Sequence, residues 1–392
     1  MTDNVNAAPE TGLKMSKYEE QLRIITRDNL FALMEAFIKT REVIAPVQGH
    51  GGEVIFYPIE SIEDVAWDWQ YVNTILPPKR FFLPQTEVIF EYRYDDSYKI
   101  TPRYDDEVRM IFGIRPCDVN ALISLDRFFG GGSLSKRTPY EEPLFPDSHY
   151  IRRRANTFII AFGCHQPGEN CFCVCCNSGP FLEEDYDLQL TSVNGDYAVE
   201  VGSARGLKII YGNEHFFRLA SPSEVQELAR IKQDAVNKFR DTCAYMSKAI
   251  RRVTENKVHD SLWEKLGERC LDCGGCSYVC PTCCCYNVVD IPLADKSGIR
   301  TRTWDSCAFA GFTRIAGGEI LRSDKKDRLK RRFFHKLSYQ YIQKNKRHGC
   351  VGCGRCITTC LADISMPLVV EAIRKHETQA TRDEPGGRSV QQ

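Results

Sequence analysis

The sequence contains no apolar run that approaches the roughly 18–20 residues a membrane-spanning helix needs. Its amino terminus, MTDNVNAAPETGLKM, lacks a basic start followed by an apolar stretch, so we expect no signal peptide. Neither charge is in excess, because 52 Lys and Arg face 52 Asp and Glu. That balance argues against a chain dedicated to nucleic acid or to anionic membranes. These absences predict a cytoplasmic protein that engages neither membrane nor nucleic acid.

Two nucleotide-binding patterns are also missing. Neither the G-x-G-x-x-G pattern nor the Walker loop occurs, so the sequence offers no glycine-rich cradle for a dinucleotide or phosphate. No pairing of a nucleophile with a general base stands out. We therefore expect a non-catalytic chain that binds no flavin or nucleotide itself.

Cysteine, in contrast, is abundant, with 19 residues, and eight of them fall in two runs with the spacing C-x2-C-x2-C-x3-C. This spacing is typical of paired [4Fe–4S] clusters, in which three cysteines of a tight loop bind one cubane and the fourth reaches the other. By that precedent the ligands of one cluster are Cys270, Cys273, Cys276 and Cys360, and those of the other are Cys350, Cys353, Cys356 and Cys280. Neighbouring clusters predict electron transfer.

Disulfides and zinc are the alternatives. Secreted disulfide frameworks are usually short chains with scattered cysteines, and their formation needs an oxidising compartment. Zinc sites generally combine two C-x2-C pairs rather than a three-plus-one set. A scaffold protein with structural zinc nevertheless remains an alternative hypothesis. Measuring the iron and zinc content of the protein would distinguish it from an iron–sulfur protein.

Four further cysteines lie in the front half of the chain: Cys117, Cys164, Cys171 and Cys173. Four thiolates are what a third [4Fe–4S] cluster needs. The alternative is that they are buried structural cysteines, which pack as small hydrophobic residues. Cys175 and Cys176 add two possible ligands beside them.

The other cysteines leave more than one interpretation open. One hypothesis is that Cys283, Cys285 and Cys307 form a further metal site. The alternative is that these three cysteines and Cys284 shield the dicluster loops. Cys243 is expected to be a core residue in the middle of a helix.

The remaining pattern predicts an α+β protein, with an N-terminal α/β domain followed by a helical two-[4Fe–4S], ferredoxin-like domain. Asp106–Ile114 and Thr157–Phe162 are typical of buried strands, and each delivers a cysteine at its carboxyl end, where ligand sites of open sheets commonly lie. Between the cysteine runs, Ala308–Lys344 has helical spacing, which favours a helical domain over a compact βαβ ferredoxin.

The expected boundaries are an N-terminal extension and helix at 1–42, an α/β domain with the candidate third cluster at 43–220, a long connecting helix at 221–262, the dicluster domain at 263–375 and a disordered tail at 376–392. Within them we expect helices at Lys14–Lys39 and Ser221–Asn256 and a surface loop at Gly130–Pro146.

The run from Lys325 to Arg332 is strongly basic. Such runs usually form a solvated helix face. The functional alternative is that this charge offsets anionic clusters, raises their potential or docks an acidic partner.

Six segments, in order along the chain, resemble one known family: IFGIRPCDVNAL, GCHQPGENCFC, CLDCGGCSYVCPTCCCYNVVD, WDSCAFAGFTRIAGG, RRFFHKLSY and CVGCGRCITTC. Together they look like the β subunit of soluble NADP-linked nickel–iron hydrogenases, the sulfhydrogenases. The electron-transfer subunit of anaerobic sulfite reductase has the same motifs. The resemblance runs from about Val43 to Val370.

The resemblance implies a cytoplasmic subunit of a hetero-oligomer that relays electrons between a reductase subunit binding FAD and NAD(P)H and a catalytic subunit. Nickel–iron hydrogenase is the preferred catalytic partner, and a sirohaem sulfite reductase subunit is the alternative. The eight dicluster cysteines match the family's ligands, and the four front cysteines match its front half. One departure is Leu361, which follows Cys360 where the usual motif has proline.

Overall fold

The computed structural model describes residues 22–67, 70–130, 146–240, 246–345 and 347–375. Its front half is built around an eight-stranded sheet with the order β10-β1-β9-β8-β7-β6-β2-β3. The strands are β1 Arg23–Ile25, β2 Glu42–Gln48, β3 Val54–Ile59, β6 Arg109–Ile114, β7 Thr157–Phe162, β8 Leu188–Val193, β9 Asp196–Val201 and β10 Phe217–Leu219. The central strands β2, β6, β7 and β8 are parallel. Strands β6 and β7 are almost wholly apolar, as is typical of parallel strands covered on both faces of the sheet.

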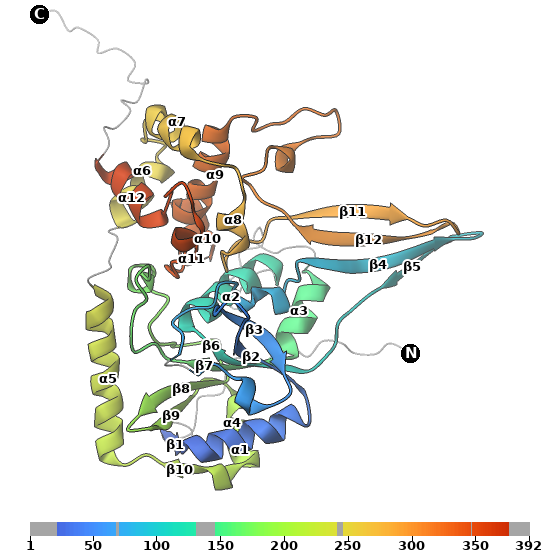
Figure 1. Cartoon of the computed structure of the whole chain (residues 1–392). Coiled ribbons are helices and arrows are strands. Elements are labelled where there is room, and N and C mark those ends of the chain that lie inside the picture. Colours follow the sequence, from blue (N-terminus) through green and yellow to red (C-terminus); the bar gives the residue numbers. More distant parts are fainter. Residues whose placement is uncertain (1–21, 68–69, 131–145, 241–245, 346, 376–392) are drawn as a thin grey trace, which may run out of the picture.

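Helices cover both faces of this sheet (Figure 1). On one face lie α1 (Arg27–Ile38) and α4 (Ala204–Gly212), which contribute residues such as Met34 and Ile209 to one core. On the other lie α2 (Pro116–Phe129) and α3 (Ser148–Ala155), which contribute residues such as Leu122 and Tyr150 to a second core. The front half is thus a three-layer α/β arrangement.

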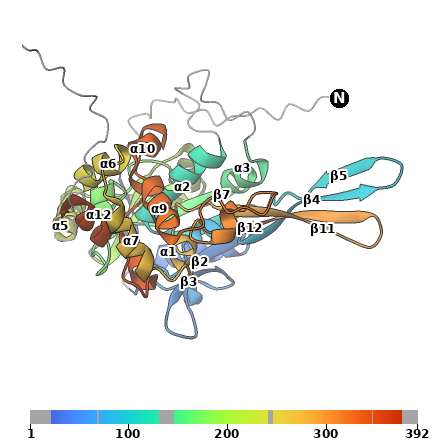
Figure 2. The same ribbon diagram turned by 90° about the horizontal axis from the view of Figure 1, so that it is seen from above.

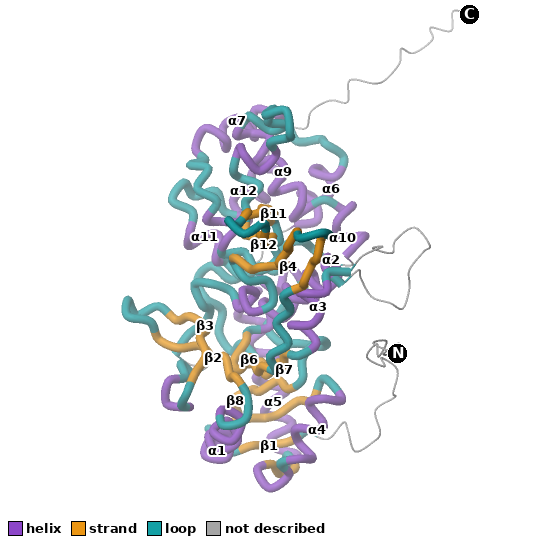
Figure 3. Tube along the Cα trace, turned by 90° about the vertical axis from the view of Figure 1, so that its right-hand side faces the viewer, coloured by secondary structure: helices purple, strands orange, loops and turns teal. Residues whose placement is uncertain are grey.

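The back half is helical. Its helices are α6 Met246–Thr254, α7 Asp260–Arg269, α8 Gly275–Tyr278, α9 Lys325–Leu337, α10 Tyr339–Asn345, α11 Arg355–Thr359 and α12 Met366–Lys375. They enclose a core around Trp263 and Phe333. Figure 3 shows this half at one end of the molecule, with the eight-stranded sheet toward the other, and α5 (Pro222–Arg240) runs alongside the sheet in Figure 1. The predicted fold class, α+β with a helical dicluster half, is confirmed.

A second sheet joins the two halves. Its order is β11-β12-β4-β5, and it pairs a hairpin of the front half with a hairpin inserted between the cysteine runs. The strands are β4 Thr86–Tyr94, β5 Tyr98–Pro102, β11 Tyr286–Pro292 and β12 Ser297–Trp304. This antiparallel β-arm projects from the body (Figures 1 and 2). The insert between the cysteine runs is therefore partly β, because β12, which contains β-branched Ile299, Thr301 and Thr303, pairs with both β11 and β4.

Short 3-10 helices connect these elements: η1 Ile62–Asp64, η2 Pro78–Phe81, η3 Cys173–Cys176, η4 Glu214–Phe216 and η5 Ala310–Thr313. In the described ranges no helix is long and apolar enough to cross a membrane.

The element predictions agree best in the sheet. The strand expected at Thr157–Phe162 is β7, and the strand expected from Asp106 begins at Arg109. Of the helix expected at Lys14–Lys39, residues 14–21 lie outside the described residues. Helix α1 begins at Arg27, because residues 23–25 pair with β9 and β10 and the Thr26 hydroxyl caps the helix by accepting from Asn29 N at 3.2 Å.

The connecting helix is described as α5 and α6, separated by residues 241–245. Its predicted start is a capping box, in which the Glu224 carboxylate accepts from Ser221 N at 2.8 Å and Glu224 N donates to the Ser221 hydroxyl at 3.4 Å. Cys243, most of the expected loop at Gly130–Pro146, and the tail at 376–392 lie outside the described residues.

Candidate metal centre

The two cysteine runs form loops of the same shape, the first cysteine loop (270–280) and the second cysteine loop (350–360). In each, a glycine directly after the second cysteine begins a short helix: Gly274 has φ 71° and precedes α8, and Gly354 has φ 78° and precedes α11. Only glycine adopts this conformation without strain, and it lets three cysteines share one tight turn. The loops pack against each other at Gly275 and Thr359.

Thiols of both loops meet at this contact. Burial raises the pKa of the Cys356 thiol to about 11; the Arg332 guanidinium opposes this shift, whereas Cys350, Cys280 and Cys276 add to it. Cysteines from the two runs are thus close enough to influence one another, as the exchange of the fourth ligand requires. Cys353 is buried, Cys270 and Cys360 are half-buried and Cys273 is exposed.

The four front cysteines line one small cavity of about 20 Å³. Cys117 lies at the start of α2, just after β6, and Cys164 follows β7, so the parallel strands deliver both to the same edge of the sheet. Cys171 and Cys173 approach from the following loop, and Cys173 is only 6% exposed. The structure brings all four sequence-predicted residues together.

This front cavity adjoins the second cysteine loop, because Gly352 and Cys353 also line it. Phe172 N donates to Gly352 O at 2.8 Å, and the Ser178 hydroxyl donates to Val351 O at 2.7 Å. Gly352 has φ 61°, and a Cβ there would stand 2.5 Å from Phe172 O. The front cysteines and the second loop therefore form one continuous site.

Four of the remaining cysteines, Cys176, Cys283, Cys285 and Cys307, each have another cysteine as a hydrogen-bond partner. A hydrogen bond from the Cys285 thiol lowers the pKa of Cys307 to about 6. Cys283 hydrogen-bonds Cys280, and Cys176 hydrogen-bonds Cys350. Cys283 is thus paired with Cys280 of the first cysteine loop, whereas Cys285 and Cys307 are paired with each other.

Within the described part of the chain, no three His, Cys, Asp or Glu side chains converge as ligands of a single metal ion. A cubane distributes its four thiolates over four irons, so its ligands stand further apart than those of one ion. The chemistry around the thiols tests the fit more directly.

Three buried cations face the cysteine loops: Lys79, Arg332 and Lys336, which are 3%, 5% and 7% exposed. Arg332 is close to Cys276 and Cys356, and Lys336 to Cys280 and Cys350. None of the three forms an ion pair with a carboxylate of the described residues, whereas buried charge normally requires a partner. Thiolate-bound clusters are anionic, so this environment fits [4Fe–4S] groups.

The basic run therefore divides between two faces of α9. On its outer face, Lys326 binds Glu264 at 2.9 Å and Lys330 binds Asp260 at 3.2 Å, as a solvated face would. On its inner face, Arg328 binds Asp272 at 2.8 Å, and Arg332 points inward one turn later. Lys79 was missed by sequence analysis, because nothing in the segment PPKRFF distinguishes it from a surface lysine.

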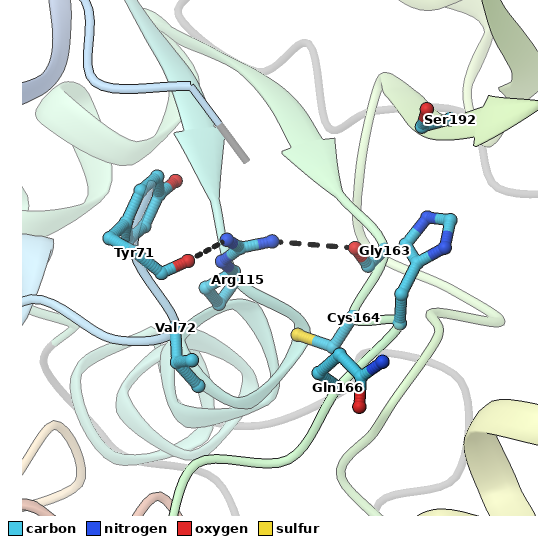
Figure 4. A pocket seen from close by; sticks show the side chains of 8 residues that line it. Tyr71, Val72, Arg115, Gly163, Cys164, Gln166 and Ser192 are labelled. Atoms are coloured by element: carbon cyan, nitrogen blue, oxygen red, sulfur yellow. Dashed lines mark hydrogen bonds between the residues drawn. The ribbon is translucent and has the colours of Figure 1, made fainter. Parts of the chain in front are cut away.

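A larger cavity of about 310 Å³ lies beside the front cysteines and shares Cys164 with them (Figure 4). It lies at the carboxyl edge of the sheet, and the Arg115 guanidinium, between Tyr71 and Gly163, donates to the carbonyl oxygens of both. Its lining residues are Tyr71, Val72, Arg115, Gly163, Cys164, His165, Gln166 and Ser192. Cys164, one of the front cysteines, thus borders a cavity that also holds the side chains of Arg115, His165 and Gln166.

Residues 269–364 match the family model of a 4Fe–4S dicluster domain, so the chain carries an iron–sulfur domain over both cysteine loops. Over 344 aligned residues the chain is 29% identical to sulfhydrogenase 2 subunit beta of Pyrococcus furiosus. The aligned region covers 87% of this chain and 96% of that protein. The resemblance to hydrogenase β subunits expected from the motifs is confirmed.

A solved structure of the F420-reducing [NiFe] hydrogenase complex from Methanosarcina barkeri matches at 10% identity, with a TM-score of 0.33. The match covers 62% of this chain and 96% of that one. A likeness this low defines neither the fold nor the function of this chain.

Proposed function

We propose that this chain is an electron-transfer subunit that relays single electrons between a reductase subunit binding FAD and NAD(P)H and a catalytic subunit, with nickel–iron hydrogenase preferred. The proposal places it in the cytoplasm, within a hetero-oligomer. Its similarity to a protein named as a sulfhydrogenase subunit supports this role. The observation that carries the proposal is that the candidate cluster sites adjoin one another. Cys353 lines the front cavity, while Cys356 of the same loop lies beside Cys276 and Cys280 of the first cysteine loop.

In this proposal two clusters use the ligands expected from the two runs, and a third uses the front cysteines. The ligand sets are Cys270, Cys273, Cys276 and Cys360; Cys350, Cys353, Cys356 and Cys280; and Cys117, Cys164, Cys171 and Cys173. When bound, each cubane takes up and releases one electron. The domains that hold them are those expected at 43–220 and 263–375. A further metal site at Cys283, Cys285 and Cys307 stays a prediction.

The chain's own residues hold and shield these sites. The glycine turns at Gly274 and Gly354 fix the two loops, and buried side chains exclude water from Cys353. Exposed Cys273 lies at the surface, where a partner's redox centre would come closest to the first loop.

The test is the content of iron, acid-labile sulfide and zinc per chain in anaerobically purified protein, with EPR of the reduced form. Two cubanes give about eight irons and three give about twelve. About twelve supports the full proposal, and about eight returns the front cysteines to a structural role. Zinc without iron would overturn the electron-transfer function.

A matched pair of variants tests the front site. Cys171→Ala should remove about four irons, because it deletes one of four ligands. Cys284→Ala should keep them all, since Cys284 packs against the core of α2 and α3 outside the proposed ligand sets. Equal iron content in both variants would remove the third cluster from the proposal.

A further inference from the structure

Lys79 reaches from the front half of the chain into the dicluster half. It lies in η2, and its ammonium group donates to Cys280 O at 2.7 Å and to Cys283 O at 2.9 Å. It also stands 4.2 Å from the centre of the Trp304 ring, which covers it. The front half thus delivers a dehydrated positive charge to the backbone that carries Cys280.

Lys336 approaches the same loop from the other side, on α9. Its ammonium group donates to the Thr282 hydroxyl, which in turn donates to Gly349 O at 2.7 Å, next to Cys350. Lys336 is therefore held between the end of the first cysteine loop and the beginning of the second. Neither Lys79 nor Lys336 is paired with a carboxylate of the described residues.

The outer part of the first cysteine loop has a different environment. The Cys270 sulfur lies 3.7 Å from an oxygen of Asp272, whose carboxylate Arg328 binds at 2.8 Å. Cys273 is exposed, and Leu271 and Leu361 beside the loops are 61% and 89% exposed. Lys325 also lies here, 3.9 Å from the Asp272 carboxylate, and donates to Cys270 O at 3.0 Å, but its side chain is 48% exposed, so solvent screens its charge. The inner site, in contrast, has two buried cations without a carboxylate partner among the described residues. Arg332 lies between the two sites and favours neither.

We propose that Lys79 and Lys336 raise the reduction potential of the inner cluster, held by Cys280, Cys350, Cys353 and Cys356, above that of the outer cluster, held by Cys270, Cys273, Cys276 and Cys360. The inference rests on the proposed function. Reduction transfers one electron from a neighbouring centre to the inner cluster and adds one negative charge there, with no bond made or broken. Burial alone disfavours the added negative charge and so lowers the reduction potential, whereas nearby cations stabilise that charge and raise the potential. The inner cluster is then where an electron rests, and the outer cluster is where it is exchanged.

Both lysines act as positioning residues, because they touch the backbone and hydroxyl groups of the ligand loop rather than iron. Their effect should be electrostatic, so the charge matters more than the shape. Lys336→Met and Lys79→Met keep most of the buried volume and remove the charge. Lys336→Arg keeps the charge. Lys330→Met is the matched control, because Lys330 lies on the same helix but on its outer face, beside Asp260.

The experiment is a potentiometric titration of the assembled protein, followed by EPR. In each Met variant of the two buried lysines we expect the reduction equilibrium of one cluster to fall at least tenfold, which is 59 mV for a one-electron couple. The other cluster should shift less. Lys336→Arg should stay near wild type and Lys330→Met should match it. Unchanged midpoints, or equal shifts of all clusters, would overturn the inference.

Iron content of the same samples separates this inference from the proposed function. A wild-type chain without about eight irons would fail the function itself, whereas full iron with insensitive midpoints would fail only the inference. If Lys336→Met loses iron, Lys79→Met carries the same test from the other half of the chain. Loss of iron from both would assign the lysines to folding and overturn their proposed role.

Discussion

The guanidinium of Arg355 donates two hydrogen bonds to the carboxylate of Asp118, at 2.6 and 2.7 Å, and both residues are almost fully buried, at 5% and 2% exposure. Arg355 lies between Cys353 and Cys356, and Asp118 directly follows Cys117. The same guanidinium donates to Thr74 O at 2.6 Å. One bidentate ion pair thus fixes the second cysteine loop to the front cysteines.

Asp118→Asn should destabilise the chain by about 3–5 kcal/mol, because it leaves Arg355 buried without its counter-charge. Denaturant unfolding measures the loss. Glu227→Gln is the control, since Glu227 pairs with Arg230 on the surface of α5 and its removal should leave the midpoint unchanged. Equal unfolding midpoints of the two variants would show that the buried ion pair contributes no more to stability than the surface pair.

Gly352→Ala should separate the second loop from the front cysteines. Its positive φ and the 2.5 Å approach to Phe172 O combine backbone strain with overpacking, for a loss on the order of 2–4 kcal/mol. Faster hydrogen exchange at Phe172 N, which bonds Gly352 O, would report it. Gly317→Ala serves as the comparison, because nothing lies within 4 Å of the added carbon, and its exchange should match wild type.

The carboxylate of Glu224 gives a prediction about pH. Hydrogen bonds from Arg218 and from Ser221 lower its pKa from 4.5 to about 2. A carboxylate with a lowered folded-state pKa contributes stability above its unfolded pKa, and that contribution is lost as the pH falls from about 4.5 to about 2. The unfolding midpoints of wild type and Glu224→Gln should therefore converge over that interval. The two proteins share their other acid-sensitive groups, so a constant difference would refute the assignment.

Removal of the metal should affect the two halves unequally. Without anionic clusters, Lys79, Arg332 and Lys336 would be buried without compensation, so α9 should lose protection from hydrogen exchange. Strand β7, in the covered core of the front sheet, should change little. Uniform loss across both elements would contradict the role of the clusters as counter-charge.

Features that depend on residues close together in the sequence could be predicted, whereas features that depend on distant residues could not. Strands β6 and β7 were predictable because a short apolar run carries its own evidence, and their cysteine ends followed from the chain direction. The role of Lys79 was not predictable, because its partners are about 200 residues away. The pairing that forms the β-arm was not predictable for the same reason, since β4 and β12 meet only in the folded chain. The start of α1 was misplaced because residues 23–25 form a strand between β9 and β10, which are distant in the sequence.

The β-arm also has a consequence for how the chain is made. Thr86 and Thr303, which face each other across β4 and β12, are 217 residues apart. During translation, the β4–β5 hairpin leaves the ribosome long before its partner hairpin exists, and its inner edge stays open for that whole time. Such distant pairing closes slowly. A late segment of the nascent chain therefore completes the sheet that links its two halves.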